Sequence, residues 1–257
     1  MLKISLVFKI IKTIENWPLY LKEKFGFIKE ERVVLELRNK AKIEIRPNTD
    51  DRPMFNHTWI KEAYTPANFN IGENDIVFDI GAHSGFFSVF AASRAKNGKV
   101  FAFEPEPENF KILKKNIGLN NFSNIIPFCL AIADTTGKRT LDIFSGSAGG
   151  HALELLHPNN ADITIGKITI DSIRLDDFLS DQKVDRIDFL KMNCEGAEYE
   201  ILFTCPDQVI SKIKKISMQY HPIDEKRNEN TLKKFLEEKG FKVTIRQQGS
   251  MLYAERR

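Results

Sequence analysis

A regular alternation of strands and helices from residue 75 onward constrains the fold most strongly. Short apolar segments, predicted to be strands, occur at 76–80, 99–103, 125–130, 187–192 and 213–220. Segments predicted to be helices fall between or after them, at 85–96, 108–119, 197–203 and 229–239. This order is typical of a parallel, doubly wound sheet. We therefore predict an α/β, Rossmann-like fold, and 257 residues suffice for one such core with a short extension.

The chain closes with a different pattern. Residues 241–247 and 251–255 flank Gln248-Gly249-Ser250, which predicts an antiparallel hairpin. A terminal hairpin at the edge of a mostly parallel sheet is a feature of class I methyltransferase folds and is less expected of a nicotinamide dehydrogenase. The intervening segment 141–170 is less regular, with two short potential strands and a Gly- and Ser-containing stretch at 145–150. We interpret it as an insertion over the site.

The first 70 residues are predicted to form an extension, and residues 71–257 the main domain. An apolar stripe of Leu2, Leu6, Ile10 and Ile14 predicts an amphipathic helix over 2–25, broken near Pro18. That stripe fits packing against its own domain or a partner subunit, or a position on a membrane surface. Residues 32–38 and 42–46 predict a β-hairpin, and 50–64 a helix.

Charge and cysteine content exclude several classes of protein. The 38 Lys and Arg residues nearly balance the 35 Asp and Glu residues and are dispersed along the chain. Nothing therefore indicates a nucleic-acid partner. Cys129, Cys194 and Cys205 are irregularly spaced and form neither a disulfide framework nor a paired zinc motif. Residues 2–14 are too short and too charged to span a bilayer, so we expect a cytoplasmic protein.

The sequence D-I-G-A-H-S-G at 79–85 follows an apolar strand and precedes a helix. Gly81 permits a sharp turn of the backbone beside a cofactor, and Gly85 permits close packing of the helix. The spacing G-x-x-x-G differs from the G-x-G-x-x-G of dinucleotide-binding proteins. Glu104 follows the next strand, where a carboxylate can accept two hydrogen bonds from a ribose diol. Together these features indicate a nucleoside-containing cofactor.

Three blocks resemble the FkbM family of methyltransferases: V-F-D-I-G-A-H-S-G-F-F-S (77–88), F-E-P-E-P-E-N-F (103–110) and L-K-M-N-C-E-G-A-E-Y-E-I-L (190–202). The resemblance covers roughly residues 42–222. It implies a class I methyltransferase fold, S-adenosylmethionine as donor, and methylation of a hydroxyl on a small molecule or glycan. It also implies a set of cofactor-lining residues, namely Asp79, Gly81, Ala82, Gly85 and Glu104, with Leu130 and Ala131 near the adenine. His83 lies inside this turn and is expected to orient the backbone.

The chain departs from the family pattern at two positions. Asn193 stands where the family has Asp, and Gln219 where it commonly has Glu. Both follow predicted parallel strands, at the sheet edge where ligands bind. A carboxylate pair there could hold a divalent cation or act as a base, whereas two amides offer neutral oxygens. Glu195 is a nearby acid, and the identity of any metal stays open.

Methyl transfer to a hydroxyl needs a proton acceptor, for which histidine is suited. His221 follows the strand of Gln219 and His151 lies in the insertion, so both are candidates to face the substrate. His57 and His157 are expected to be structural or solvated. The acid pairs Asp176-Asp177 and Asp50-Asp51 resemble helix starts, where Asp stabilises free amides.

We therefore expect an O-methyltransferase. A catalytically impaired cofactor-binding or scaffold protein is the alternative that Asn193 and Gln219 raise. A nicotinamide-dependent oxidoreductase is disfavoured by the glycine spacing. The oligomeric state, including a homo-oligomer, stays open.

Overall fold

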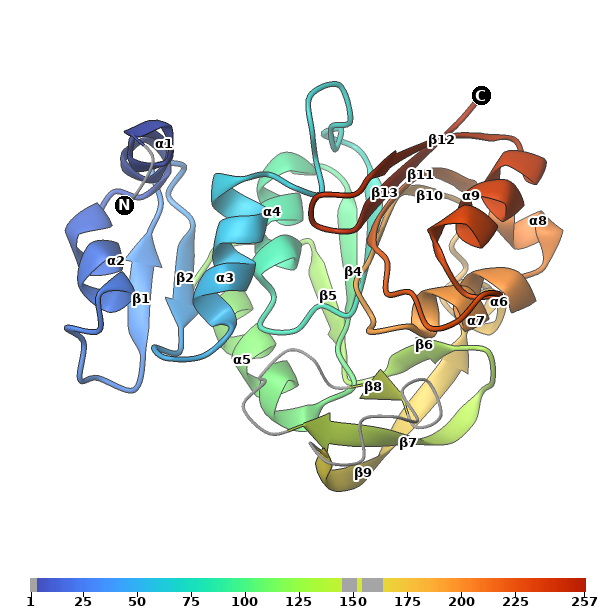
Figure 1. The fold of residues 1–257 in the computed structure, drawn as a ribbon, viewed down its shortest axis with the longest axis horizontal. Coiled ribbons are helices and arrows are strands. Elements are labelled where there is room, and N and C mark those ends of the chain that lie inside the picture. Colours follow the sequence, from blue (N-terminus) through green and yellow to red (C-terminus); the bar gives the residue numbers. More distant parts are fainter. Residues whose placement is uncertain (1–3, 145–151, 154–163) are drawn as a thin grey trace.

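The computed structural model describes residues 4–144, 152–153 and 164–257. At its centre is a seven-stranded sheet (Figure 1). The strands lie in the order β12 (Phe241–Arg246), β13 (Met251–Arg256), β11 (Ile213–Gln219), β10 (Ile187–Met192), β3 (Ile76–Ile80), β4 (Lys99–Phe103) and β5 (Ile125–Phe128). Strands β11, β10, β3, β4 and β5 pair in parallel, while β13 is antiparallel to both its neighbours. The predicted Rossmann-like sheet with a terminal antiparallel hairpin is confirmed.

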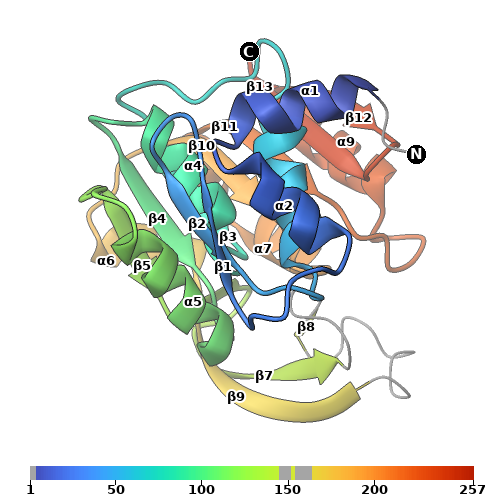
Figure 2. The ribbon, with the colours of Figure 1, turned by 90° about the vertical axis from the view of Figure 1, so that its left-hand side faces the viewer.

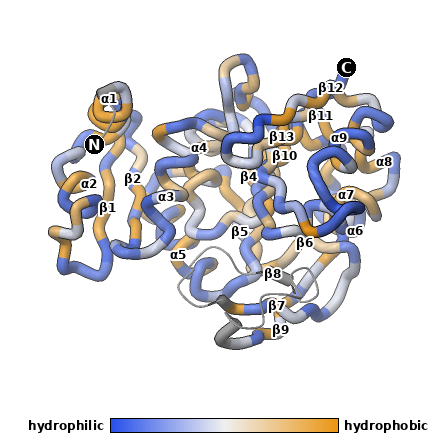
Figure 3. The backbone as a smooth tube through the Cα atoms, viewed as in Figure 1, coloured by the Kyte–Doolittle hydropathy of each residue, from blue (hydrophilic) through white to orange (hydrophobic). Residues whose placement is uncertain are grey.

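Helices cover both faces of this sheet because its strands bury side chains on both sides. On one face, Val77 and Phe189 pack with α4 (Phe86–Arg94) and α5 (Pro107–Gly118). On the other face, Phe78 and Leu190 pack with α6 (Leu175–Asp181), α7 (Ala197–Thr204), α8 (Asp207–Ile210) and α9 (Glu229–Glu238). Figure 3 shows hydrophobic chain in the central strands and hydrophilic chain in many connecting loops. The result is two cores separated by the sheet.

The N-terminal region forms the predicted helix and hairpin. It comprises α1 (Ile4–Thr13), α2 (Trp17–Lys24), β1 (Val33–Glu36), β2 (Lys42–Ile45), α3 (Asp51–Phe55) and a single π-helical turn, η1 (Asn56–Ile60). Figures 1 and 2 show α1, α2 and the hairpin together at one end of the molecule. Ile10 and Ile14 are buried in the core shared with α4 and the sheet. Of the predicted stripe, Leu6, Ile10 and Ile14 therefore pack against the chain's own domain, whereas Leu2 lies outside the described residues. The boundary at residue 70 stays a prediction.

The predicted break near Pro18 is confirmed, because α1 ends at Thr13 and α2 begins at Trp17. Pro18 lies in the first turn of α2, where a missing N–H costs nothing. Phe8, on the outward face of α1, is 61% exposed, and contact of that face with a membrane surface stays a prediction. Within the described residues, no helix is long and apolar enough to cross a membrane.

The segment between β5 and α6 is more regular than predicted. It forms a second sheet in the order β6 (Ala131–Ala133), β9 (Thr164–Arg174), β7 (Gly137–Phe144) and β8 (Ala152–Leu153). Two short strands were predicted within 141–170, but β7 and β9 extend past both ends of that range and pair along nearly their whole length. Residues 145–151 and 154–163, which include His151 and His157, lie outside the described residues.

The acid pairs at the helix starts do not act as side-chain caps. The first residue before α6 is Arg174, and its guanidinium pairs with Asp176 at 3.0 Å. Asp177 instead accepts a hydrogen bond from Thr136. Asp50 precedes α3 without a capping hydrogen bond, and Asp51 is turned inward to Arg46. Their structural assignment holds, but the capping chemistry predicted for them is wrong.

Candidate active site

Two adjoining cavities open at the carboxyl ends of β3, β4, β10 and β11, the edge at which ligands bind in such sheets. Five residues line both cavities: Met54, Gly81, His83, Asn193 and Glu195. The narrower cavity continues past Glu104 toward the small sheet. The larger one, of about 340 Å³, continues toward the N-terminal region. The shared lining makes them two halves of one cleft.

The glycine turn after β3 is fixed by a close approach of two backbones. Gly81 has a φ of +73°, and a Cβ placed on it would lie 2.0 Å from the carbonyl oxygen of Asn193. Only glycine meets both demands. Gly85 also has a positive φ, and its Cβ would lie 2.4 Å from Cδ1 of Leu113, so this glycine lets α4 approach α5. Each glycine therefore has its own structural reason.

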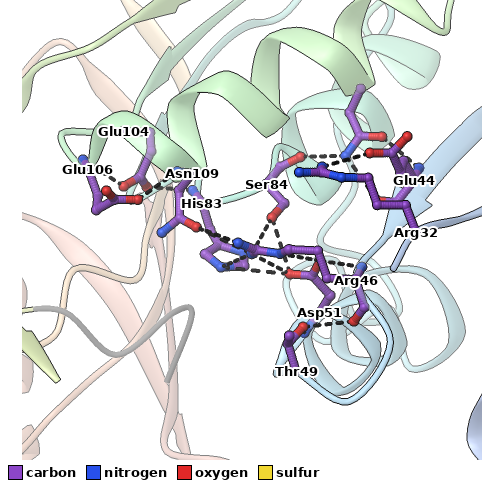
Figure 4. Close-up of polar contacts among 11 residues, drawn as sticks. Arg32, Glu44, Arg46, Thr49, Asp51, His83, Ser84, Glu104, Glu106 and Asn109 are labelled. Atoms are coloured by element: carbon purple, nitrogen blue, oxygen red, sulfur yellow. Dashed lines mark hydrogen bonds and ion pairs between the residues drawn. The ribbon is translucent and has the colours of Figure 1, made fainter. Parts of the chain in front are cut away.

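A cluster around Arg46 joins the N-terminal hairpin to this turn (Figure 4). Arg46 follows β2, and its guanidinium donates to both carboxylate oxygens of Asp51, at 2.8 and 2.9 Å. It also donates to Ser84 Oγ at 3.1 Å and lies 3.2 Å from Nε2 of His83. Asp51 is fully buried, and bidentate charged pairs of this kind fix geometry strongly. The extension thus holds the turn in place.

Glu104 is the acid of the narrower cavity. One of its carboxylate oxygens accepts the backbone N–H of His83 at 2.7 Å, and the other accepts that of Glu106 at 3.0 Å. Burial raises the pKa of Glu104 to about 7, although both N–H donors oppose the rise. Each oxygen keeps accepting capacity beyond these bonds. A ligand that donates hydroxyl protons would stabilise the ionised form.

A buried ion pair lies beneath the turn. Lys191 Nζ is 2.8 Å from Asp79 Oδ1 and donates to the carbonyl oxygen of Gly81 at 2.7 Å. Ser88 donates to the other oxygen of Asp79 at 2.6 Å. Lys191 lines the larger cavity, whereas Asp79 is not among the described residues that line either half. Asp79 therefore supports the cofactor turn from below instead of facing a ligand.

Three neighbouring side chains, Glu198, His221 and Glu195, interact with one another on the sheet side of the cleft. His221 Nδ1 lies 3.1 Å from a carboxylate oxygen of the fully buried Glu198, and its Nε2 lies 3.5 Å from Glu195. Burial alone would lower the pKa of His221, but the two carboxylates raise it to about 9. At neutral pH the ring is cationic and cannot accept a proton. The expectation that His221 acts as a base facing substrate is contradicted, and His221 holds Glu195 at the cleft.

The N-terminal side of the larger cavity carries His57, Thr58, Lys61 and Tyr64. The rings of His57 and Tyr64 meet edge to face, with centroids 5.0 Å apart. Burial lowers the pKa of His57 to about 4, helped by the charges of Lys61 and Lys191. His57 was predicted to be structural or solvated, but it lines the cavity as a neutral imidazole.

Most of the predicted site residues come together here. The described lining includes Gly81, Ala82, His83, Glu104, Leu130, Ala131, Asn193, Glu195 and Gln219. Gly85 and His221 are not part of it, because Gly85 packs on α5 and His221 lies behind Glu195. The sequence interpretation missed Lys191, Tyr64, His57 and Arg46. A lysine between Leu190 and Met192 in a strand predicted to be buried was the one available signal, since a buried charge needs a partner.

The described residues show no group of three or more His, Cys, Asp or Glu placed to hold a metal ion. They do offer features suited to an adenosyl donor. Oδ1 of Asn193 is buried at the junction of the cavities without a hydrogen-bond partner, so it can accept from a ligand N–H or O–H. Glu104 supplies an acceptor pair in the narrower half. The residues present therefore fit S-adenosylmethionine.

Comparisons with known proteins agree with this geometry. The family description "Methyltransferase FkbM domain" matches residues 79–243. The 31-O-demethyl-FK506 methyltransferase FkbM of Streptomyces tacrolimicus is 23% identical over 195 residues, 66% of this chain and 75% of that protein. The hexuronic acid methyltransferase AglP of Haloferax volcanii is 27% identical over 131 residues, 51% of this chain and 49% of the relative.

A crystal structure of methyltransferase FkbM from Methylobacillus flagellatus KT shares the fold, with a TM-score of 0.51 at 15% identity. The match covers 74% of this chain and 45% of that protein. The fold, the cleft and the family match over residues 79–243 lead to one conclusion. The chain belongs to the FkbM family of S-adenosylmethionine-dependent methyltransferases.

Proposed function

We propose that this protein transfers the methyl group of S-adenosylmethionine to a hydroxyl of a small molecule or glycan. The observation that carries the proposal is the division of the cleft into two halves. The narrow half has Glu104, Leu130 and Ala131, and the larger half adds His57, Thr58 and Gln219. One half suits an adenosyl group and the other an acceptor. The residues at the junction, Asn193 and Glu195, would lie where donor and acceptor meet.

When bound, the donor supplies an electrophilic methyl group on a cationic sulfur. Glu104 would accept hydrogen bonds from ribose hydroxyls, with Leu130 and Ala131 beside the adenine. Asn193 would accept from a donor N–H, and the Glu195 carboxylate, 3.5 Å from His221 Nε2, would favour a cation at the junction. The protein's contribution to rate is then alignment in a cleft that limits water.

The names of two relatives are consistent with this acceptor. One refers to an O-demethylated form of FK506, which indicates oxygen as the accepting atom, and the other to a hexuronic acid, which is a sugar derivative. The lining of the larger half is consistent with a hydroxylated acceptor, because His57, Thr58, Gln219 and Asn193 offer hydrogen-bonding groups around an aromatic floor of Phe86 and Phe87. We propose a sugar or similarly hydroxylated compound.

The alternative is a protein that binds the donor without turnover, motivated by Asn193 and Gln219 in place of carboxylates. The comparisons give no sign of such impairment. Calorimetry with S-adenosylmethionine, followed by assay of S-adenosylhomocysteine release with a set of sugar glycosides, separates the two. We expect binding and turnover.

The Asn193→Asp, Gln219→Glu double variant is the comparator. Binding by the native chain without turnover, together with turnover by the double variant, would establish impairment. Failure of the native chain to bind the donor would refute the proposal altogether.

A further inference from the structure

The larger half of the cleft holds a histidine whose surroundings differ from those of the other described histidines. His57 lies in η1, a single π-helical turn directly after α3. Such turns occur mostly as local insertions in helices and often at functional sites. The π-helical turn belongs to the segment that brings His57, Thr58 and Lys61 into the cavity lining. The π-helical backbone therefore sets the position of His57 at the cavity.

The other two described histidines near the cleft, and Glu195, each already have a hydrogen-bond or ion-pair partner. His83 lies 3.2 Å from the Arg46 guanidinium, which occupies the lone pair of its Nε2. His221 is held between two carboxylates and carries a proton at neutral pH. Glu195 already forms an ion pair with His221, at 3.5 Å.

The ring nitrogens of His57 have no comparable partner among the described residues. Among the described residues, no hydrogen bond or ion pair to either ring nitrogen is found, and its one close partner is the edge-on ring of Tyr64. The charged groups around it favour the neutral ring. Lys61 follows on its own segment and Lys191 reaches in from β10, both positive. Asp50 and Glu195 share the cavity, whereas α3 and α4 contribute only uncharged side chains to its lining.

We propose that His57 is the catalytic base that takes the proton of the acceptor hydroxyl. The inference rests on the proposed O-methylation. The acceptor oxygen forms a bond to the methyl carbon while the bond from that carbon to sulfur breaks, and its electron pair stays on sulfur. The hydroxyl proton passes to the free nitrogen of His57 and then to solvent through the open cavity. The products are a methyl ether, a neutral thioether and one released proton.

A weak base suffices for this step. As the methyl group arrives, the hydroxyl becomes far more acidic than a free alcohol, so a neutral imidazole of low pKa can accept its proton. A low pKa also keeps the ring unprotonated across the physiological range. Positioned bases of this kind contribute about 10²- to 10⁴-fold to rate.

The test compares the native chain with His57→Gln and His57→Ala. Turnover is measured with S-adenosylmethionine and two probes, methyl β-D-glucuronide and methyl β-D-glucoside. Affinity for S-adenosylhomocysteine is measured by calorimetry. We expect kcat to fall by about 10²-fold or more in both variants, while the affinity for S-adenosylhomocysteine stays within about threefold of the native value. Added imidazole should restore part of the rate of His57→Ala and leave the native rate unchanged.

The outcomes distinguish a failure of the proposed role of His57 from a failure of the proposed O-methylation. Native turnover with equal rates in the His57 variants, or loss of rate without rescue by imidazole, would overturn the role of His57 and leave the methyltransferase proposal standing. A native chain that binds the donor but methylates neither probe would contradict the proposed sugar hydroxyl acceptor, and the role of His57 with it. The ratio of native to His57→Gln rate should also shrink above pH 9, where hydroxide replaces the base.

Discussion

The two walls of the cleft hold their histidines in opposite states. On the sheet side, His221 stands between Glu195 and Glu198, and its pKa is raised to about 9. On the N-terminal side, His57 is buried beside Lys61 and Lys191, and its pKa is lowered to about 4. Both rings are partly buried, so burial does not explain the difference between their pKa values. The sign of the neighbouring charges decides which ring is a fixed cation and which is a free base.

The opposite shifts give opposite effects of pH on stability. The folded state favours the proton on His221, so that stabilisation is complete below pH 6.5 and is lost as the pH rises through about 9. It disfavours the proton on His57, so stability is complete above pH 6.5 and is lost as the pH falls through about 4. The cleft is therefore best assembled near neutrality.

The largest expected effect comes from the backbone contact that joins the walls. In Gly81→Ala the new Cβ would lie 2.0 Å from the Asn193 carbonyl oxygen, and φ would be strained. We expect the free energy of unfolding to fall by more than about 5 kcal/mol, with loss of donor binding. Urea unfolding and calorimetry measure both. Gly118→Ala, where the added carbon meets nothing within 4 Å, is the control and should change stability by less than about 1 kcal/mol.

The second-largest effect is expected from removing the positive charge of Lys191, which lies beneath the glycine turn. Lys191→Met leaves the carboxylate of Asp79 buried without its partner, at a cost of about 3–5 kcal/mol. The same change takes away one of the positive charges near His57, so the pKa of His57 should rise. Urea unfolding checks the first effect, and the double variant Asp79→Asn with Lys191→Met should recover most of the loss. A double variant as unstable as the single one would show that the pair is not the cause.

Removing the anion behind His221 tests the sheet wall. Glu198→Gln should bring the pKa of His221 back toward its usual range, because Glu198 raises it more than Glu195 does. The change should remove most of the roughly 3 kcal/mol of stability that is present at pH 6 and absent at pH 10. Unfolding free energies at the two pH values measure this. Glu225→Gln removes an exposed carboxylate and should leave the pH dependence as it is. Equal pH profiles in all three proteins would contradict the charge assignment.

The smallest effect is expected on the N-terminal wall. Lys61→Gln removes an exposed cation, whose influence on His57 is screened by solvent, so the pKa of His57 should rise by about half a unit. Proton NMR of the histidine C2 hydrogens follows this titration. Lys226→Gln, a change at an exposed lysine outside the lining of the cavity, should leave it unchanged. A fall in the pKa would show that Lys61 does not act through its charge.

The sheet wall was largely predictable from sequence, and the N-terminal wall was not. Gly81, Glu104 and Asn193 follow predicted strands, so the rule that parallel strands end at one edge brings them together. His57 and Tyr64 reach the cleft only through packing of the segment 50–64 against α4, which no local pattern encodes. A histidine gives no periodic signal, and a π-helical turn has none of its own.

The second sheet was predicted only in part, as two short strands, for a related reason. Strands β7 and β9 pair with one another more than with the main core, and several of their side chains stay exposed, as at Lys138 and Asp171. Their alternation therefore resembles that of a polar loop. Lys191, in contrast, could have been found, because a lysine flanked by Leu190 and Met192 in a buried strand requires a buried anion.

The central claim is that the walls differ in protonation, with His57 free to take a proton and His221 unable to. The most direct measurement is an NMR titration of the native protein, with the two resonances assigned by His57→Gln and His221→Gln. The account predicts one ring still neutral down to about pH 4 and the other still charged up to about pH 9. Two rings that both titrate near pH 6.5 would contradict it.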